Sequence, residues 1–311
     1  MKQLILFITT FIFVFTPLSS QVTITGTYGK AAESGKAMTV TSTRKIKRGD
    51  TKLIKLDEAT IRCAYRFTQP VYIEKETFQQ TDTMILDIGN KISRYYDAHR
   101  MMRDSLFSNL MKEKMSINTI QSIAVMKDGD MSAMGPSGPT IESETKGETS
   151  VMLKNRLDKE ITIIDKGENR DNYKCIDKVE PQQWSITSDT LTILGYLCQK
   201  ATTEFRGRNY EAWFTPDIPI NEGPWKFYGL PGMILKVNDS EDLFSFEIIG
   251  LEQLANPVDI TMPEEEYINC KLKDLQKLKE KRSGGMGISI NGGNIVMVQK
   301  KNNNKYLHLE N

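Results

Sequence analysis

Short runs of β-branched and aromatic residues, each closed by turn formers, follow one another between Val151 and Gly250. Such runs predict β-strands, and their close succession is typical of an antiparallel meander, a sandwich or an open barrel. We therefore expect an α+β fold that is mainly β, built on an open antiparallel sheet or half-barrel. The strands expected in this region are residues 161–165, 173–176, 184–187, 198–205, 210–214, 233–237 and 244–249.

Several runs are spaced as hairpins, in which a short loop of Gly, Asn, Asp or Ser joins two strands. Before the acidic loop at 238–242, Met233, Leu235 and Val237 alternate with other side chains. Because successive side chains of a strand point to opposite faces, this arm offers one strongly apolar face. The expected hairpins are 84–88 with 92–96, 201–205 with 210–214, 233–237 with 244–248, and 288–290 with 295–298.

Two segments have the spacing of apolar residues that predicts an amphipathic helix. The first runs from Ala98 to Lys114, and Asp97 is placed to cap it. The second runs from Pro263 to Arg282, and Thr261 followed by Glu264 matches a capping box at its start. The expected buried stripes are Met102, Leu106, Phe107, Leu110 and Met111 in the first helix, and Ile268, Leu272 and Leu275 in the second.

The N-terminus has the pattern of a secretory signal peptide. Lys2 precedes an apolar run from Leu4 to Phe15, and a stretch of small residues ends at Ser20, after which we place the cleavage site. Removing this segment leaves 40 basic and 40 acidic residues, a balance that argues against nucleic acid as the main partner. We expect an exported protein, periplasmic or secreted, with no transmembrane segment in the mature chain.

Composition divides the chain further. We expect a signal peptide at 1–20, a polar, mobile N-terminal segment at 21–57, a single β-rich domain at 58–282 and a Gly- and Asn-rich tail at 283–311. Within the domain, residues 131–139 are rich in Gly, Pro and Ser. This composition predicts either a linker or a long loop.

The cysteines are compatible with a disulfide in an exported protein, because disulfides persist in oxidising compartments. Four cysteines allow three pairings, and spacing does not choose among them. We expect no metal site and no cofactor. The four candidates for disulfides are Cys63, Cys175, Cys198 and Cys270.

The most unusual stretch runs from Trp213 to Val237. It contains Pro216, Pro219 and Pro224 in close succession and then the corner Gly229-Leu230-Pro231-Gly232. Proline followed by glycine fits a type II turn, because glycine tolerates the positive φ of its third position. The chain is therefore expected to leave one strand, cross in an extended Pro-rich path and turn sharply into the next.

This stretch carries a resemblance. Residues Gly229-Leu230-Pro231-Gly232-Met233-Ile234 resemble the signature of the GLPGLI family, secreted bacterial proteins of uncharacterised function. The segments 195–201, 212–219 and 223–227 resemble the same family, with Met233 standing where the family usually has Leu. The family implies no catalytic residues. At the level of fold, the arrangement is also similar to outer-membrane lipoprotein-carrier proteins, half-barrels that hold acyl chains on an apolar face.

We expect a non-catalytic binding module for a lipid, acyl or peptide ligand. The candidate ligand-binding residues are Trp213, Trp225, Phe227, Tyr228 and Leu230, with Gly229, Pro231 and Gly232 forming the structural turn. The alternative for each is an ordinary core or corner residue.

Three other functions are weighed against this one. An accessory protein docking on an outer-membrane partner by sheet-edge pairing has the same sequence features. A hydrolase with an unrecognised site is disfavoured, because neither His99 nor His308 stands in a motif with a serine or cysteine nucleophile. Copper binding by Met126, Met131 and Met134 is disfavoured, because methionines are spread over the whole chain.

Overall fold

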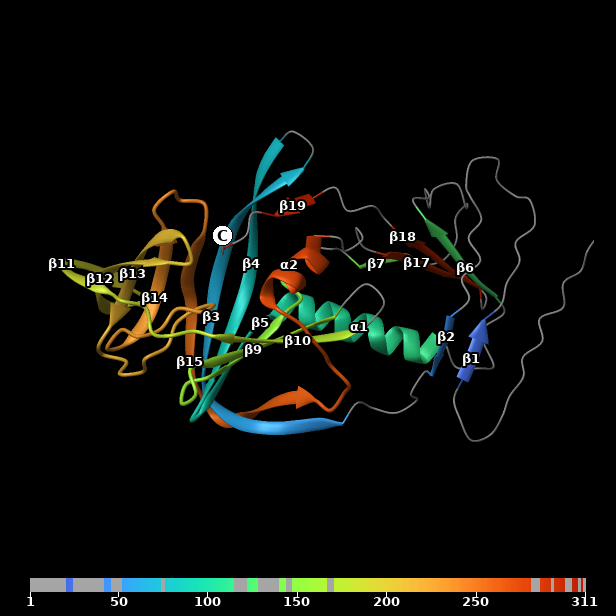
Figure 1. Ribbon diagram of the computed structural model, residues 1–311, viewed down its shortest axis with the longest axis horizontal. Helices are drawn as coiled ribbons and strands as arrows, with labels where there is room; N and C mark the ends of the chain where they lie inside the picture. The colour runs from blue at the N-terminus through green and yellow to red at the C-terminus, as the bar shows by residue number, and fades with distance from the viewer. Residues whose placement is uncertain are drawn as a thin grey trace, which may run out of the picture.

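Strands dominate the protein (Figure 1). The computed structural model describes residues 21–24, 42–45, 52–73, 76–114, 122–127, 140–143, 147–166, 171–280, 286–291, 294–299, 304–306 and 309. The expected signal peptide, the segment 131–139 with its two methionines, and His308 lie outside the described residues. The predicted fold class, α+β and mainly β with an open antiparallel sheet and two helices, is confirmed.

One sheet of 13 strands forms the body of the protein, and its neighbours are antiparallel except for β10 and β16. In order across the sheet, the strands are β11 (Ser185–Ile193), β12 (Tyr196–Phe205), β13 (Arg208–Thr215), β14 (Met233–Asp239), β15 (Ser245–Pro263), β3 (Leu53–Ile73), β4 (Glu76–Gly89), β5 (Ile92–Asp97), β8 (Val151–Asn155), β9 (Glu160–Lys166), β10 (Asn172–Lys178) and β16 (Ile268–Asn269). The remaining strand, β19 (Asn304–Tyr306), pairs with β3.

Two smaller sheets are separate in hydrogen bonding. One pairs β1 (Gln21–Ile24) with β2 (Ser42–Lys45). The other has the order β6 (Ser122–Lys127), β18 (Asn294–Gln299), β17 (Met286–Asn291) and β7 (Thr140–Ser143). The predicted hairpin near the C-terminus is therefore found as β17–β18, and the other three are found as β4–β5, β12–β13 and β14–β15.

The longest strands, β3 and β15, form a bent ribbon at the centre of the main sheet. They have 21 and 19 residues, and their pairing shifts register at three places. An unpaired residue bends its strand and increases its twist. The ribbon starts at Leu53, inside the segment 21–57 that was expected to precede the β-rich domain. Its outer part packs Ala59 and Ile260 against Leu153, making a small second core.

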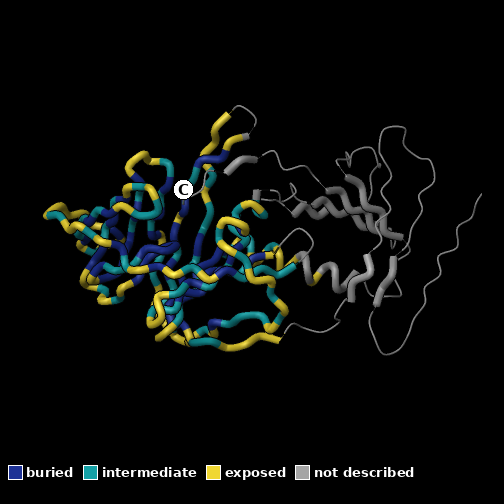
Figure 2. The backbone as a smooth tube through the Cα atoms, viewed as in Figure 1, coloured by how far each residue is buried: buried dark blue, intermediate teal, exposed yellow. Residues whose placement is uncertain are grey.

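The main core lies on the other face of the sheet. Met152 of β8 belongs to it, whereas its neighbour Leu153 belongs to the second core, as alternation along a strand requires. Figure 2 shows the buried residues, in dark blue, gathered in the main sheet and alternating with partly buried ones along the strands.

The first predicted helix is confirmed as α1 (Ala98–Lys114). Asp97 caps it, because its carboxylate accepts a hydrogen bond from the Arg100 amide at 2.9 Å. The predicted buried stripe is wrong at Met102 and Leu106, which are both exposed. The remaining stripe residues have side chains outside the described set. No helix among the described residues is long and apolar enough to cross a membrane.

The second predicted helix is correct only in its last half. It forms as α2 (Leu272–Glu280), and Leu275 is buried while Ile268 is exposed. Thr261 and Pro263 belong to β15, where Thr261 pairs with Lys55 and Pro263 with Leu53. The capping-box pattern does not start a helix here, because the backbone groups of these residues form hydrogen bonds with β3. This long-range pairing outweighs the local helix preference.

None of the four cysteines forms a disulfide, so the expected bridge is not found. Cys63, Cys175 and Cys198 are buried and Cys270 is partly buried. Burial raises the pKa of the Cys63 thiol to about 12, with Glu222 adding to the shift and Lys154 opposing it. At neutral pH this thiol stays protonated, which makes it a small core side chain and a poor nucleophile.

Candidate functional site

The Pro-rich connection from β13 to β14, residues 216–232, is called here the corner segment. It crosses the inner face of the main sheet and is tied to β14 by two backbone hydrogen bonds. The Met233 amide donates to Ile218 O at 3.0 Å, and the Ile234 amide donates to Glu222 O at 2.9 Å. In the expected type II turn, Met233 would instead donate to Leu230, so the corner closes differently from the prediction.

Glycine is required where the corner meets β13. A Cβ on Gly232 would lie 2.1 Å from the carbonyl oxygen of Thr215, and the residue has a φ of 156°. Gly232 donates its amide to Leu230 O at 2.8 Å, which tightens the corner. The Gly-Leu-Pro-Gly motif therefore allows the close approach of two backbone segments.

The candidate ligand-binding side chains lie mostly in the core. Trp225, Phe227 and Leu230 are buried, whereas Trp213 and Tyr228 are partly buried and pack against them. Phe227 is the centre of a ring cluster in which neighbours meet edge-on or tilted, an arrangement that aromatic rings favour. Centroid distances from Phe227 are 4.8 Å to Tyr210, 5.2 Å to Trp225, 6.0 Å to Phe205 and Phe246, and 6.3 Å to Trp184.

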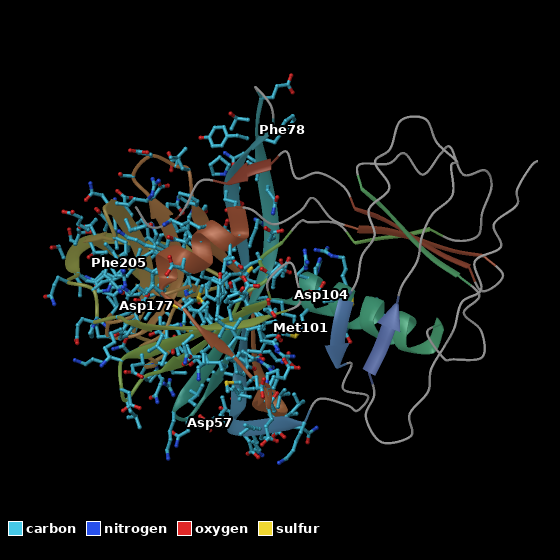
Figure 3. The ribbon with its side chains drawn as sticks, turned by 45° about the vertical axis from the view of Figure 1, so that its right-hand side comes forward. Asp57, Phe78, Met101, Asp104, Asp177 and Phe205 are labelled. Carbon is cyan, nitrogen blue, oxygen red and sulfur yellow. The ribbon has the colours of Figure 1, made fainter. Side chains whose placement is uncertain are left out.

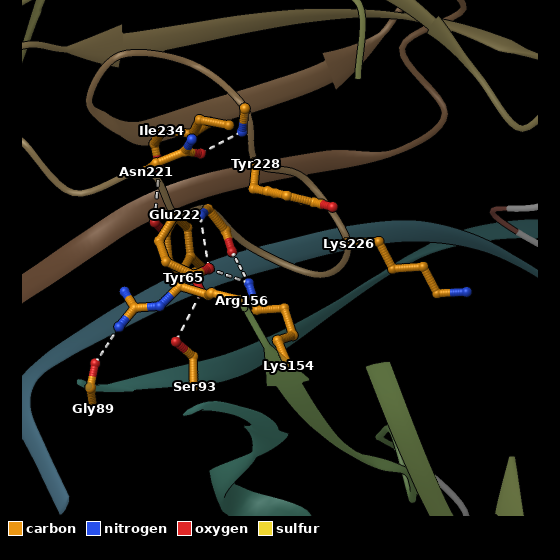
Figure 4. A network of polar contacts seen from close by, with 12 residues as sticks. Tyr65, Gly89, Ser93, Lys154, Arg156, Asn221, Glu222, Lys226, Tyr228 and Ile234 are labelled. Carbon is orange, nitrogen blue, oxygen red and sulfur yellow. Dashed lines mark hydrogen bonds and ion pairs between the residues drawn. The ribbon is translucent and has the colours of Figure 1, made fainter. Parts of the chain in front are cut away.

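A buried ionic network ties the corner segment to β5 and β8 (Figure 4). The Lys154 ammonium pairs with the Glu222 carboxylate and donates to Gly223 O at 2.8 Å. Ser93 donates to the other Glu222 oxygen at 2.7 Å. Lys154, Glu222 and Ser93 are all buried. A charge removed from water at this depth requires its partner, so the network holds the segment in one position.

A second set of contacts holds the segment to β10 and the chain after it. The buried Lys226 ammonium lies 2.6 Å from Asp177, which also pairs with Arg206 at 2.8 Å. The Gln182 side chain donates to Lys226 O at 3.2 Å and accepts from the Tyr228 amide at 2.9 Å. Figure 3 shows Asp177 and Phe205 together within the body, away from Phe78 on the β3–β4 arm.

These contacts define what the corner segment does. It touches β10 near one end of the sheet and, through Phe205 and Tyr210, β12 and β13 near the other. Because strands far apart in the sheet contact the same short segment, the sheet curves around it. The segment therefore fills the inner face of the curved sheet with the protein's own side chains.

The free end of the sheet is a different kind of surface. Among the strands that the structure describes, β11 pairs only with β12, so its other edge is free. Leu191, Leu194 and Leu197 on this hairpin are 40%, 51% and 59% exposed. These leucines were not among the binding residues predicted from the sequence, although the alternation Thr190-Leu191-Thr192-Ile193 is a strand signal.

Glu148 joins α2 to the edge of the core and makes stability depend on pH. Burial would raise its pKa, but the Lys279 ammonium at 2.5 Å and the Ser150 amide at 2.8 Å outweigh burial and lower the pKa to about 2 from 4.5. A carboxylate with a lowered folded pKa stabilises above its unfolded pKa, and this contribution disappears as the pH falls from about 5 to about 2.

We predict that Glu148→Gln loses about 1–2 kcal/mol of unfolding free energy at pH 7, less than the full pKa shift implies because the side chain is 31% exposed. The variant should lose no further Glu148-dependent stability below pH 5. Urea unfolding from pH 7 to pH 3 measures this, with the exposed Glu180→Gln as control. Parallel acid limbs for wild type and Glu148→Gln would contradict the assignment.

Of the comparisons with known proteins, one matches the corner segment. A family model described as "Protein of unknown function (Porph_ging)", a GLPGLI-type family, matches residues 205–236. No curated protein matches the chain. Two solved structures, "Structure of PNGF-II in P21 space group" and "Structure of PNGF-II in C2 space group", are similar at 16% and 15% identity, each with a TM-score of 0.42 and covering 70% of this chain and 33% of that chain.

The chain thus spans about a third of the length of those structures, and at this TM-score the likeness says nothing of activity. Neither structure is described as a lipoprotein carrier. The matched residues 205–236 run from the end of β12 through the corner segment into β14. The chain is therefore similar, over its corner segment and the flanking strands, to a family of proteins whose function is unknown.

Proposed function

We propose that the protein is an exported, non-catalytic docking module that binds an extended segment of a partner protein along the free edge of β11. The observation that carries the proposal is an edge strand with no second neighbour among the described strands and with exposed apolar side chains at its turn end. The regular stretch of this edge is residues 190–193, because the pairing with β12 shifts register between Ile186 and Thr190. An edge of this kind pairs readily with another chain. A partner in the outer membrane fits the expected export.

The register shows which backbone groups are available. Ile193 and Tyr196 flank a two-residue turn and pair with each other, followed by Thr192 with Leu197 and Leu191 with Cys198. Residues that close such a turn exchange hydrogen bonds, and the next pair does not. The amide and carbonyl of Thr192 therefore point away from β12, toward the position of an added strand.

The inner face of the curved sheet is the weaker candidate for a ligand. A lipid or acyl chain held there would have to displace Phe227 and Trp225 from the core. It would also have to disrupt the buried ion pair between Lys154 and Glu222. Each of these steps costs free energy on the order of several kcal/mol. Among the described residues, no contact favours a hydrolase.

Site-specific photocrosslinking in the native cell envelope tests the edge. A photoreactive residue in place of Ser188, which is exposed on β11, should give one discrete protein adduct. The same residue in place of Lys178, exposed on β10, should not. Thr192→Pro removes an outward amide while leaving the β11–β12 pairing in place, and should abolish the adduct. Thr192→Val keeps the amide and should retain it.

Three results would overturn the proposal. One is the absence of any adduct from position 188. Another is an adduct from position 188 that persists in Thr192→Pro, because backbone pairing would then not carry the contact. The third is the same adduct from position 178, which would show proximity in the envelope without a specific edge.

A further inference from the structure

The turn of the β11–β12 hairpin has a backbone conformation that its first residue disfavours. Leu194 has a φ of 48° and Gly195 a φ of 85°, which is the pattern of a type I′ turn. Asn or Asp normally occupies the first position, because a left-handed conformation is costly for a residue such as leucine. The chain thus keeps an exposed leucine where a polar residue would make a more stable turn.

The apolar side chains of the tip point in several directions. Leu191 pairs with Cys198 and Leu197 pairs with Thr192, and adjacent pairs of an antiparallel ladder lie on opposite faces. Leu191 and Leu197 therefore lie on opposite faces of the hairpin, with Leu194 at its end. Ile193 and Cys198, on the same face as Leu191, are buried in the main core, so Leu191 lies at the margin of the face that packs on the protein. Leu194 and Leu197 extend beyond this contact, at the end and on the outer face of the hairpin.

The tip is also uncharged. From Thr190 to Gln199 the chain carries no Asp, Glu, Lys, Arg or His, and the next residue, Lys200, is paired with Glu211 at 3.0 Å. A stretch without charged side chains suits the boundary between lipid headgroups and hydrocarbon, because moving a charge into hydrocarbon costs free energy. Tyr196 follows the turn, and tyrosine is favoured at membrane–water interfaces. Figure 1 shows the hairpin at the far end of the main sheet from α1.

We propose that the tip of the β11–β12 hairpin inserts Leu191, Leu194 and Leu197 into the headgroup–hydrocarbon boundary of a lipid bilayer. The insertion is shallow, because the outward amide and carbonyl of Thr192 need water, headgroups or a partner strand. This inference goes beyond docking at the edge and does not depend on it. Because burial of apolar side chains drives the binding, we expect the protein to bind zwitterionic vesicles, with an affinity that depends little on salt.

Flotation of the purified protein with phosphatidylcholine vesicles tests the insertion. Wild type should float with the vesicles at low and high salt. Leu194→Asn and Leu197→Asn should each weaken binding about tenfold, the effect of withdrawing one leucine side chain from hydrocarbon. Leu157→Asn is the matched control, since Leu157 is 72% exposed on the β8–β9 turn and should have no effect.

A second measurement separates insertion from misfolding. Leu194→Asn should raise Tm by about 1–3 °C, because asparagine tolerates the left-handed conformation, while binding falls. Thr192→Pro removes no tip leucine, so it should float normally even though it is expected to lose edge pairing.

Failure of wild type to float would overturn the proposal. So would an equal loss of flotation in Leu157→Asn. If vesicles do not bind but Leu194→Asn removes the photocrosslink at position 188, the tip enters a partner protein and the lipid proposal is wrong, while docking at the edge stands.

Discussion

Lys154→Met should lower the free energy of unfolding by about 3–5 kcal/mol, because it leaves the buried Glu222 carboxylate without its counter-charge. The loss is expected to exceed that of any surface charge in the protein. Adding Glu222→Gln should restore part of the stability, since the double variant contains no unpaired buried charge. Urea unfolding at neutral pH, monitored by tryptophan fluorescence, gives the three free energies.

Lys178→Met is the control for this experiment. Lys178 forms an ion pair with Glu160 at 3.4 Å on the surface, and such pairs contribute about 0–1 kcal/mol. A double variant no more stable than Lys154→Met alone, or equal losses for Lys154→Met and Lys178→Met, would show that the Lys154–Glu222 pair does not hold the corner segment.

Phe227→Ala should cost about 3–5 kcal/mol, the usual range for a large aromatic side chain removed from a packed core. The ring is fully buried and contacts aromatic neighbours from the segment, from β12, β13 and β15, and from the chain before β11. No single neighbour can fill the space that it leaves. Thermal unfolding should show a clear fall in Tm for this variant.

Phe78→Ala is the matched control, because Phe78 lies exposed on the β3–β4 arm (Figure 3). Its replacement should change the free energy of unfolding by about 0.5 kcal/mol or less. If Phe227→Ala were as stable as Phe78→Ala, the ring would line a ligand site open to water, as the sequence alone allows.

Local features were predicted well. The helix after Asp97 and the four hairpins depend on residues close together in the chain: a cap, apolar spacing, and loops of turn formers. Such local preferences do not depend on tertiary contacts, and here they agree with the final fold. The leucines at the end of β11 were missed because they are exposed. Alternation of apolar residues indicates a strand, but it does not show whether the apolar side chains are buried.

Long-range pairing explains the main error. Residues 261–263 have the local signature of a helix start but pair with residues 53–55, about 200 positions away. Nothing near Thr261 records that β3 will supply hydrogen bonds there. The same limit applies to α1, whose apolar spacing predicts burial at Met102 and Leu106 although no neighbouring element covers them among the described residues.

The role of the corner segment could not be predicted from the sequence either, because it also depends on contacts with distant residues. Its aromatic residues stood out in the chain, but a core position and a ligand-binding position have the same sequence pattern. The deciding contacts join Glu222 to Lys154 and Ser93, which lie 68 and 129 positions away. An acidic residue in a Pro-rich connection carries no local sign that it will be buried.

The central claim is that the corner segment is part of the core, so that binding belongs to the free end of the sheet. Hydrogen exchange at the amides of Phe227, Met233 and Ile234 tests this most directly, because each is bonded within the segment or to β14. We predict exchange as slow as that of β4 and β13, close to the limit of global unfolding. Fast exchange at these amides, with the strands still protected, would contradict it by showing a segment that opens and exposes the inner face to a ligand.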